Sequence, residues 1–329
     1  MNLWLLAGRR FLRDWVGMAS AVVVLAFIAL AGASALGWIA RDWSEEVAVS
    51  YAAPSFLARE VREVEREAAS SVPQDDYGIA DPLAAELAEI RSRLTDGAVA
   101  GAKASVLAFG ADKWGRDVLK KAIKGTQTSL LVGFAAAGLA TLLGTLLGSL
   151  AGYYGSWADD FFNWLYSVFT SIPYLLLVLA VAAVLGQKGI LTVVLILGLT
   201  GWTGIFRLVR AEYLKHRVRE YVLAADAVGA SDLRRMFAHI LPNVSHVVLV
   251  QLSLHVVLFI KSEVILSFLG FGVGVDTVSW GSMLAEAPSE LILGMWWQIA
   301  AATSAMALAV TAFSLFTDAA RDALDPRLQ

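Results

Sequence analysis

The chain has 329 residues, of which 58% are hydrophobic and only 17% are charged, and its net charge is −3. A soluble domain is nearer one half apolar and one quarter charged, so this composition indicates a membrane protein, and the negative charge argues against a nucleic-acid partner. The chain contains no cysteine, which excludes disulfides, thiolate metal sites and cysteine nucleophiles.

Six segments are long and apolar enough to cross a membrane, since a helical span needs about 20 mostly apolar residues. We therefore expect an all-α membrane protein with six transmembrane helices. The apolar run that starts at Val16 is longer than the hydrophobic region of a cleavable signal, which indicates a retained first helix. The fourth span is short, and glycines near its end can bend it. The predicted spans are Val16–Ala40, Leu130–Tyr153, Phe161–Leu185, Ile190–Phe206, Val244–Phe268 and Trp296–Phe316.

The positions of Lys and Arg orient these helices, because cytoplasmic loops are enriched in both. Arginines precede the first span and fill the loop after the fourth, whereas the loop Leu269–Met295 contains neither Lys nor Arg. The loop Gly155–Asp160 departs from this pattern, since it is expected inside but carries two acids and no cation. The topology predicts a multi-pass membrane protein with both termini in the cytoplasm.

Three regions follow from this topology. Residues 1–40 form the cytoplasmic N-terminus and first helix, residues 41–125 an extracytoplasmic insert, and residues 126–329 a five-helix core. The insert is too long for an ordinary connection. Apolar residues at helical spacing in its residues 56–64 and 83–94 predict two short amphipathic helices. These helices pack on each other or on the membrane surface, or they dock another outer component.

The second span carries glycines at four-residue spacing, at Gly144, Gly148 and Gly152. Small residues at this spacing let helix backbones approach closely in lipid. The glycine face therefore packs either against a helix of the same chain or against a partner subunit.

The cytoplasmic loop, residues 207–243, contains a short predicted helix of small residues. Gly229 allows the turn that ends this helix, and a proline marks the entry to the next span. A helix this small and apolar fits a groove on another protein. The residues of interest in the loop are Tyr221, Ala224, Ala225, Gly229, Ala230, Ser231, Leu241 and Pro242.

A second motif, FGADKWGRD at residues 109–117, lies just before the second span. We expect Asp112, Arg116 and Asp117 to form a charge-assisted network that holds a tight turn at the outer membrane edge, between Gly110 and Gly115. The motif either caps the second span or contacts a substrate-delivery protein.

Both motifs resemble a known family. The cytoplasmic loop is similar to the EAA loop of ATP-binding cassette (ABC) importer permeases, although Leu223 stands where the family glutamate falls. The outer motif resembles the GTDxxGRD element of the C-type subunit in dipeptide, oligopeptide and nickel importers, with Ala111 in place of the threonine. Segments Gly152–Ala180, Ser262–Ala287 and Asp318–Arg327 also resemble this family, so that the resemblance covers nearly all of the chain except about residues 41–106 of the insert.

The resemblance implies the type I ABC importer permease fold and half of a translocation pathway for di- or oligopeptides. It also implies an EAA-type coupling loop and four kinds of partner. These are a homologous second permease subunit, two ATPase subunits (a homo- or heterodimer), an extracytoplasmic solute-binding protein and membrane lipid. ATP and Mg would bind the ATPase subunits. Nickel or another small solute is the alternative cargo.

Catalytic and metal-binding motifs are missing from this sequence. It has no GxxxxGK[ST] phosphate loop, no HExxH and no GxSxG, and its histidines lack a metal-ligand spacing. We therefore expect a transport subunit with no cofactor of its own rather than an enzyme.

One membrane acid stands out, because charges inside a span usually face a cavity or a partner. Glu263 lies late in the fifth span, two residues after Lys261, and lines a pathway or acts as an interfacial anchor or salt bridge. A secondary carrier would need acids in several spans and an internal repeat, whereas Glu263 is the only candidate.

Overall fold

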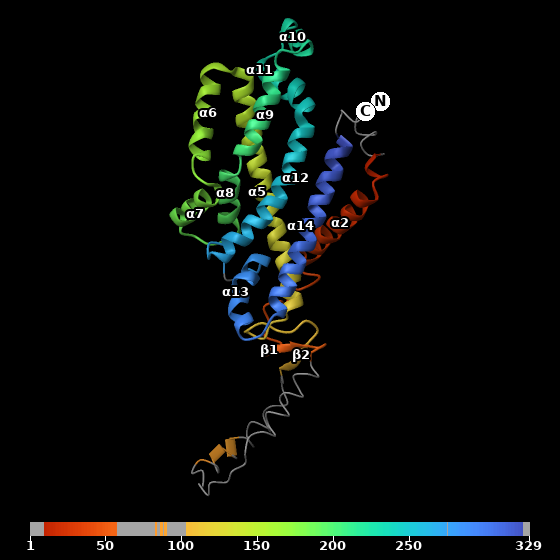
Figure 1. Ribbon diagram of the computed structural model, residues 1–329, viewed down its shortest axis with the longest axis vertical. Coiled ribbons are helices and arrows are strands. Elements are labelled where there is room, and N and C mark those ends of the chain that lie inside the picture. Colours follow the sequence, from red (N-terminus) through yellow and green to blue (C-terminus); the bar gives the residue numbers. More distant parts are fainter. Residues whose placement is uncertain are drawn as a thin grey trace.

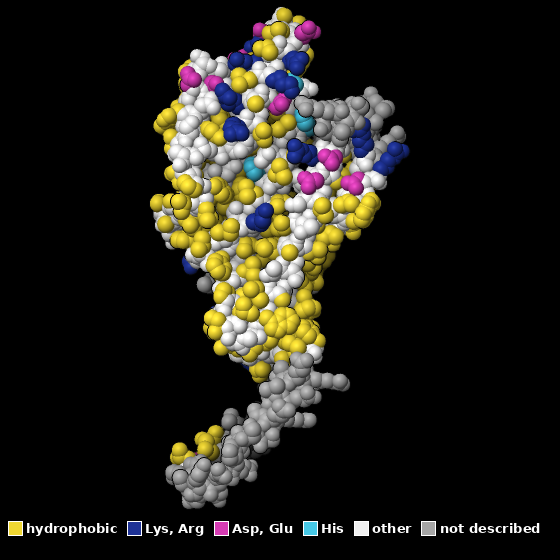
Figure 2. All heavy atoms as spheres, viewed as in Figure 1, with side chains coloured by type: hydrophobic (Ala, Val, Ile, Leu, Met, Phe, Trp, Pro, Cys, Tyr) yellow, Lys and Arg dark blue, Asp and Glu magenta, His cyan; other side chains and the backbone are white. Residues whose placement is uncertain are grey.

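The computed structural model describes residues 10–57, 83, 86–87, 89–90, 103–274 and 276–324. It is an elongated helical bundle with α10 (Glu220–Ala227) at one end and a two-stranded sheet at the other (Figure 1). Lys, Arg, Asp and Glu side chains gather near the α10 end, and hydrophobic side chains cover most of the middle (Figure 2). This distribution is that of a multi-pass membrane protein.

Among the described residues, four helical stretches are long and apolar enough to cross a membrane, or up to six spans if each of two bent pairs counts as one. The four are α2 (Trp15–Ala35), α5 (Val118–Tyr154), the stretch Asp232–Phe268 and α14 (Trp297–Leu324). The bent pairs are α6 (Ser156–Thr170) with α7 (Tyr174–Leu185), and α8 (Ile190–Thr200) with α9 (Thr203–His216). The stretch Asp232–Phe268 comprises α11 (Asp232–Arg234), a π-helical turn η1 (Arg235–Ile240) and α12 (Leu241–Phe268).

The predicted third and fourth spans are both bent. The third turns by 88° before Pro173, which lacks the N–H that a continuing helix needs. The fourth turns by 42° at Gly201, where a Cβ would lie 2.3 Å from the Phe259 ring. The predicted glycine bend in the fourth span is therefore present, and the third span is bent as well.

Helix boundaries also differ from the prediction. The second span begins at Val118 rather than at Leu130, inside the range expected for the insert, because the Asp117 carboxylate accepts hydrogen bonds from the Leu119 and Lys120 N–H groups at 2.8 and 3.3 Å. The first helix, α2, ends at Ala35 rather than at Ala40. Exposed tryptophans, Trp15 and Trp38, flank it at both ends, as is common at membrane interfaces.

The glycine face of α5 packs inside this chain, against α9. A Cβ on Gly144, Gly148 or Gly152 would lie 2.5–2.7 Å from a backbone oxygen of α9 or of Trp202 before it. Of the two interpretations of this face, packing within the chain is therefore confirmed. Helix α5 runs through the bundle and contacts α2, α6, α8, α9, α12, α13 (Trp280–Ile292) and α14.

The acidic loop that departs from the charge pattern is explained by an ion pair. Asp159, in the first turn of α6, accepts hydrogen bonds from Nε and a terminal nitrogen of Arg210 on α9 at 2.5 and 2.7 Å. The missing cation is thus supplied by the next arginine-rich segment at the same end of the bundle.

The insert contributes a strand that the sequence reading missed. Strand β1 (Ala48–Pro54) pairs in parallel with β2 (Ala104–Leu107), with Pro54 opposite Leu107. Most of the two predicted amphipathic helices lies outside the residues that the structure describes.

Candidate functional site

Helix α10 forms the tip of one end of the bundle, beyond α9 and α12 (Figure 1). Its C-terminus is closed by a left-handed residue, Gly229, at φ +82°. The Gly229 N–H donates to the Asp226 carbonyl at 2.8 Å, and the Ala230 N–H donates to the Ala225 carbonyl at 3.0 Å. This pair of bonds is a Schellman cap, so the predicted helix and its glycine turn are both present.

The two faces of α10 have opposite surroundings. Val222 and Ala225 are buried, and Val222 packs in a cluster with Tyr213 of α9 and Met236 of η1. The other face and the turn after it are open, with Ala224 among the exposed residues. The large apolar side chains exposed there are Leu223 at 55%, Val228 at 86% and Leu233 at 62%.

Polar contacts fix this tip to the long helices. Arg235 of η1 forms ion pairs with both Asp226 of α10 and Asp232 of α11. The Tyr153 hydroxyl at the end of α5 donates to the Asp232 carboxylate at 2.9 Å, and Tyr221 contacts the His216 ring of α9 at 2.9 Å. A displacement of α10 therefore acts on the ends of α5, α9 and α12 together.

Three other residues singled out in this loop lie at helix ends. The Ser231 hydroxyl accepts a hydrogen bond from the Arg234 N–H at 3.4 Å and caps α11. Leu241 and Pro242 are the first residues of α12, where a proline is tolerated because no helical N–H partner is lost. Sequence reasoning missed the π-helical turn η1 between them, a rare element that often accompanies functional sites.

At the opposite end, the motif at residues 109–117 forms the predicted tight turn. Oδ1 of Asp112 accepts hydrogen bonds from the Trp114 and Arg116 N–H groups at 2.9 and 3.0 Å. Gly110 and Gly115 adopt φ of +78° and +81°, and a Cβ on Gly115 would lie 2.0 Å from the Ala48 carbonyl of β1. No other residue type fits the Gly115 position.

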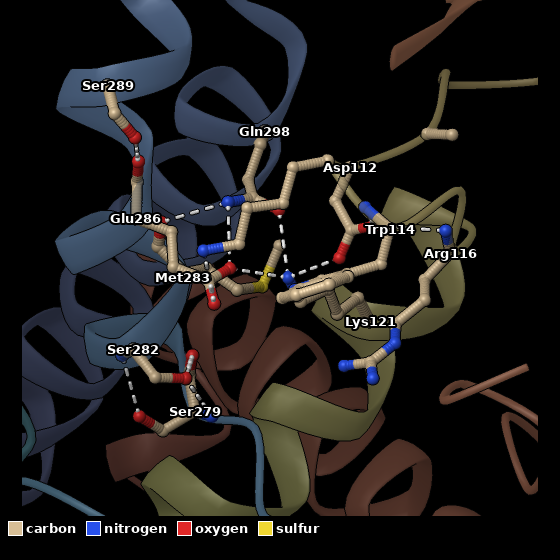
Figure 3. A network of polar contacts seen from close by, with 12 residues as sticks. Asp112, Trp114, Arg116, Lys121, Ser279, Ser282, Met283, Glu286, Ser289 and Gln298 are labelled. Carbon is tan, nitrogen blue, oxygen red and sulfur yellow. Dashed lines mark hydrogen bonds and ion pairs between the residues drawn. The ribbon is translucent and has the colours of Figure 1, made fainter. Parts of the chain in front are cut away.

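The expected ion network among Asp112, Arg116 and Asp117 was wrong. Oδ2 of Asp112 instead accepts a hydrogen bond from Lys121 Nζ of α5 at 2.7 Å, and the same ammonium donates to Glu286 of α13 at 2.7 Å (Figure 3). Asp117 is used as the cap of α5. The Asp112 carboxylate is buried and meets Lys121 inside the bundle, whereas the Arg116 side chain extends away from it.

A second acid of α13 is buried near this network. Glu290 is 1% exposed, and neither of its carboxyl oxygens has a hydrogen-bond partner. Burial raises the pKa of Glu290 to about 7, although the positive charge of Lys121 lowers it. No sequence pattern points to this residue, because its burial depends on how α13 packs.

Glu263 lies inside the helix packing and is fully buried. Its carboxylate accepts hydrogen bonds from the hydroxyls of Ser129 at 3.1 Å, Ser267 at 2.7 Å and Ser279 at 2.7 Å, which join α5, α12 and the start of α13. Hydroxyl groups, rather than Lys261, are therefore its partners. A pathway role for Glu263 stays a prediction. Among the described residues, no group of His, Asp and Glu is arranged to hold a metal ion.

Comparisons with known proteins agree on one family. Residues 144–329 match the family described as "Binding-protein-dependent transport system inner membrane component". The dipeptide transport system permease protein of Bacillus subtilis is 36% identical over 221 residues, which cover 67% of this chain and 69% of that protein. The oligopeptide transport system permease protein of the same organism is 34% identical, with coverage of 67% and 72%. The di/tripeptide transport system permease protein of Pseudomonas aeruginosa is 36% identical, with the same coverage.

Proposed function

The chain belongs to the family of binding-protein-dependent transport system inner membrane components and is a permease subunit of an ABC importer, and on this premise we propose that it forms half of a translocation pathway for di- or oligopeptides. Permease subunits of this kind are transport components, and the ATPase resides on separate subunits. The peptide cargo is inferred from the printed names of the relatives, which are dipeptide, oligopeptide and di/tripeptide permeases.

The observation that carries the coupling role is the exposed apolar tip. Side chains as large as Leu223, Val228 and Leu233 project from one small end of the molecule, and such a patch usually marks an interaction site. We propose that an ATPase subunit covers it. The family glutamate position is held by Leu223, which adds apolar area to this contact.

Transmission from the tip follows from its attachment. When ATP closes the ATPase pair, the pull on α10 passes through Val222, Arg235 and Asp232 to the inner ends of α5, α9 and α12. Because α5 contacts most of the other helices, it carries this motion to the outer end. The coupling-loop residues singled out from the sequence are thus proposed to act in two ways. Ala224 lies on the exposed face of α10 that contacts the ATPase, and Ala225 lies on the buried face that holds α10 on the bundle.

The remaining partners and the topology are part of the same proposal. A homologous second permease would complete the pathway, and a solute-binding protein would deliver peptide at the outer end. The start of α2, the end of α14 and α10 all lie at one end of the bundle (Figure 1), which supports placing both termini and α10 in the cytoplasm of a bacterial inner membrane. Residues 41–125 then belong to the outer side.

Uptake by a reconstituted complex tests this function. Vesicles that contain the chain, its second permease, both ATPase subunits and the binding protein should accumulate a labelled tripeptide only with ATP. Val228→Asp, which places a charge on the tip, should abolish uptake and peptide-stimulated ATP hydrolysis. Val49→Asp, an equal change at the opposite end, should leave hydrolysis intact.

Two results would reject the proposal. Uptake by the isolated chain without ATPase subunits would identify a secondary carrier. Uptake of nickel but of no peptide by the complete complex would assign the alternative cargo.

A further inference from the structure

A hollow of about 510 Å³ opens at the outer end of the bundle. Several separate segments line it: Trp43 before β1, the turn at residues 109–117, Lys121 of α5, the connection between α7 and α8, the segment from the end of α12 to α13, and one face of α13 itself. Its volume lies in the range of about 300–1,000 Å³ that is usual for small-ligand sites. None of the residues assigned above to the coupling tip takes part in it.

Arg116 lines this hollow, and neighbouring side chains restrict the position of its guanidinium. Its centre lies 5.7 Å from the ring of Trp43 and 6.0 Å from the ring of Trp114, so that two aromatic rings restrict its position. The Nε atom is buried and has no hydrogen-bond partner. Figure 3 shows the Arg116 side chain directed away from the carboxylates of Asp112 and Glu286.

Three acids near Arg116 form ion pairs with other cations. Asp112 and Glu286 both bind Lys121 at 2.7 Å, and Glu46 binds Lys103 at 2.8 Å. No ion pair joins Arg116 to an acid in the part of the chain that the structure describes. Arg116 lines the hollow, and a planar guanidinium is the group that proteins use most readily to bind a carboxylate in a two-point contact.

The rest of the hollow carries both signs of charge. Lys113 and Lys121 also line it, and both pair with Glu286 of the same wall. Lys188, on the connection between α7 and α8, adds a further cation, and Asp276, in the segment between α12 and α13, adds a further acid. The Lys188 and Asp276 side chains are exposed. Cations, an acid and aromatic walls in one hollow match the chemistry of a short zwitterionic peptide, which has a carboxylate at one end and an ammonium at the other.

We propose that this hollow binds a short peptide at the outer end of the permease, with Arg116 holding the C-terminal carboxylate and with Trp43 and Trp114 contacting the adjacent side chain. The proposal rests on the peptide cargo proposed above and adds the site that first receives it in this subunit. Lys188 supports the carboxylate, and Asp276 faces the ammonium end. A folded protein partner would need a broad surface of roughly 800 Å², whereas the Arg116 guanidinium lies in a hollow of small-ligand size.

A photoreactive tripeptide tests this site. The probe carries a benzophenone side chain and is used as the free acid and as the C-terminal amide, on the assembled complex in lipid nanodiscs without the binding protein. Labelled residues are identified by mass spectrometry. The free acid should label the residues of the hollow at about one tenth of the concentration that the amide needs, since one charge-assisted pair is worth about tenfold or more in affinity.

Variants separate the role of Arg116 from a loss of folding. Arg116→Gln should remove the preference for the free acid, and Arg116→Lys should restore only part of it because the planar fork is lost. Lys124→Gln removes a cation of the same end that is not in the wall of the hollow and that bonds to Gln127 rather than to an acid, and it should keep the full preference. Should Arg116→Gln fail to assemble, Lys188→Gln, an exposed position, should still reduce the preference.

Three outcomes overturn the inference. These are equal labelling by acid and amide in the wild type, labelling outside the hollow, and an unchanged preference for the free acid in Arg116→Gln. The last outcome would show that this guanidinium does not hold the carboxylate. If the wild-type complex takes up peptide normally in the vesicle assay, such a failure concerns the hollow alone and leaves the proposed function standing.

Discussion

Replacing Lys121 by methionine tests the charge network that holds the outer turn on the bundle. The Lys121 ammonium donates to Asp112 and Glu286 at 2.7 Å each and to Gln298 at 3.1 Å, and Asp112 is fully buried. Without the lysine, the Asp112 carboxylate keeps only its two backbone N–H donors. Breaking a buried pair by removing one partner costs about 3–5 kcal/mol, so we expect Lys121→Met to lower the free energy of unfolding by that amount.

The opposite partner should be less sensitive. Asp112→Asn keeps Oδ1 for the Trp114 and Arg116 N–H groups, and Lys121 keeps Glu286 and Gln298. We expect a loss of about 1–3 kcal/mol. In the double variant no charge is left unpaired between positions 112 and 121, so its loss should fall short of the sum of the single losses by at least about 1 kcal/mol.

The assay is equilibrium unfolding of the four proteins in mixed micelles at one pH and salt concentration. If the two single losses add to within about 0.5 kcal/mol of the double loss, the two side chains do not interact. The assignment of Lys121 as the partner of the motif aspartate would then be refuted.

Three further changes test other parts of the structure. Gly229 has φ +82° and open space where a Cβ would lie. Asparagine tolerates this backbone conformation, so Gly229→Asn should retain more transport than Gly229→Val. Equal loss of transport in both variants would point to a contact made by residue 229 rather than to its backbone conformation. Gly148→Ala places a Cβ 2.7 Å from the Phe206 carbonyl and should reduce the yield of folded chain. Gly138→Ala on the same helix meets nothing within 4 Å and should be neutral or stabilising. Equal yields of the two variants would contradict the packing of α5 against α9. Burial raises the pKa of Glu290 from 4.5 to about 7, so the folded state binds the extra proton and loses stability as the pH rises through that interval. Glu290→Gln should remove this fall of the unfolding midpoint between about pH 4.5 and 7, and a variant that keeps the wild-type pH dependence would refute the explanation.

Local patterns carried most of what could be predicted from the sequence. The apolar runs placed the long helices, and the small residues before Gly229 placed α10 and its cap, because a helix and its C-terminal turn are decided by residues within a few positions of each other. The acidic loop at Asp159 looked anomalous only because its partner, Arg210, lies 51 positions away.

Contacts between distant segments could not be predicted. The motif aspartate Asp112 was paired with its sequence neighbour Arg116, whereas its true partner Lys121 is selected by the packing of α5 against α13. Likewise, Glu263 is held by Ser129 and Ser279 as well as by Ser267, its neighbour one helical turn away. A single sequence gives no information on contacts between distant segments. The three serine hydroxyls around Glu263 and the hollow beside Arg116 are therefore visible only in the folded structure.

Cross-linking from the tip of α10 tests the coupling role most directly. Since the chain has no cysteine, Val228→Cys provides a single thiol at the exposed tip, and Val49→Cys provides one at the opposite end. In the active, assembled importer, a photoreactive reagent on residue 228 should attach to an ATPase subunit, and the same reagent on residue 49 should not. An importer that transports normally but gives no ATPase adduct from residue 228, or gives one from residue 49, would contradict the docking of α10.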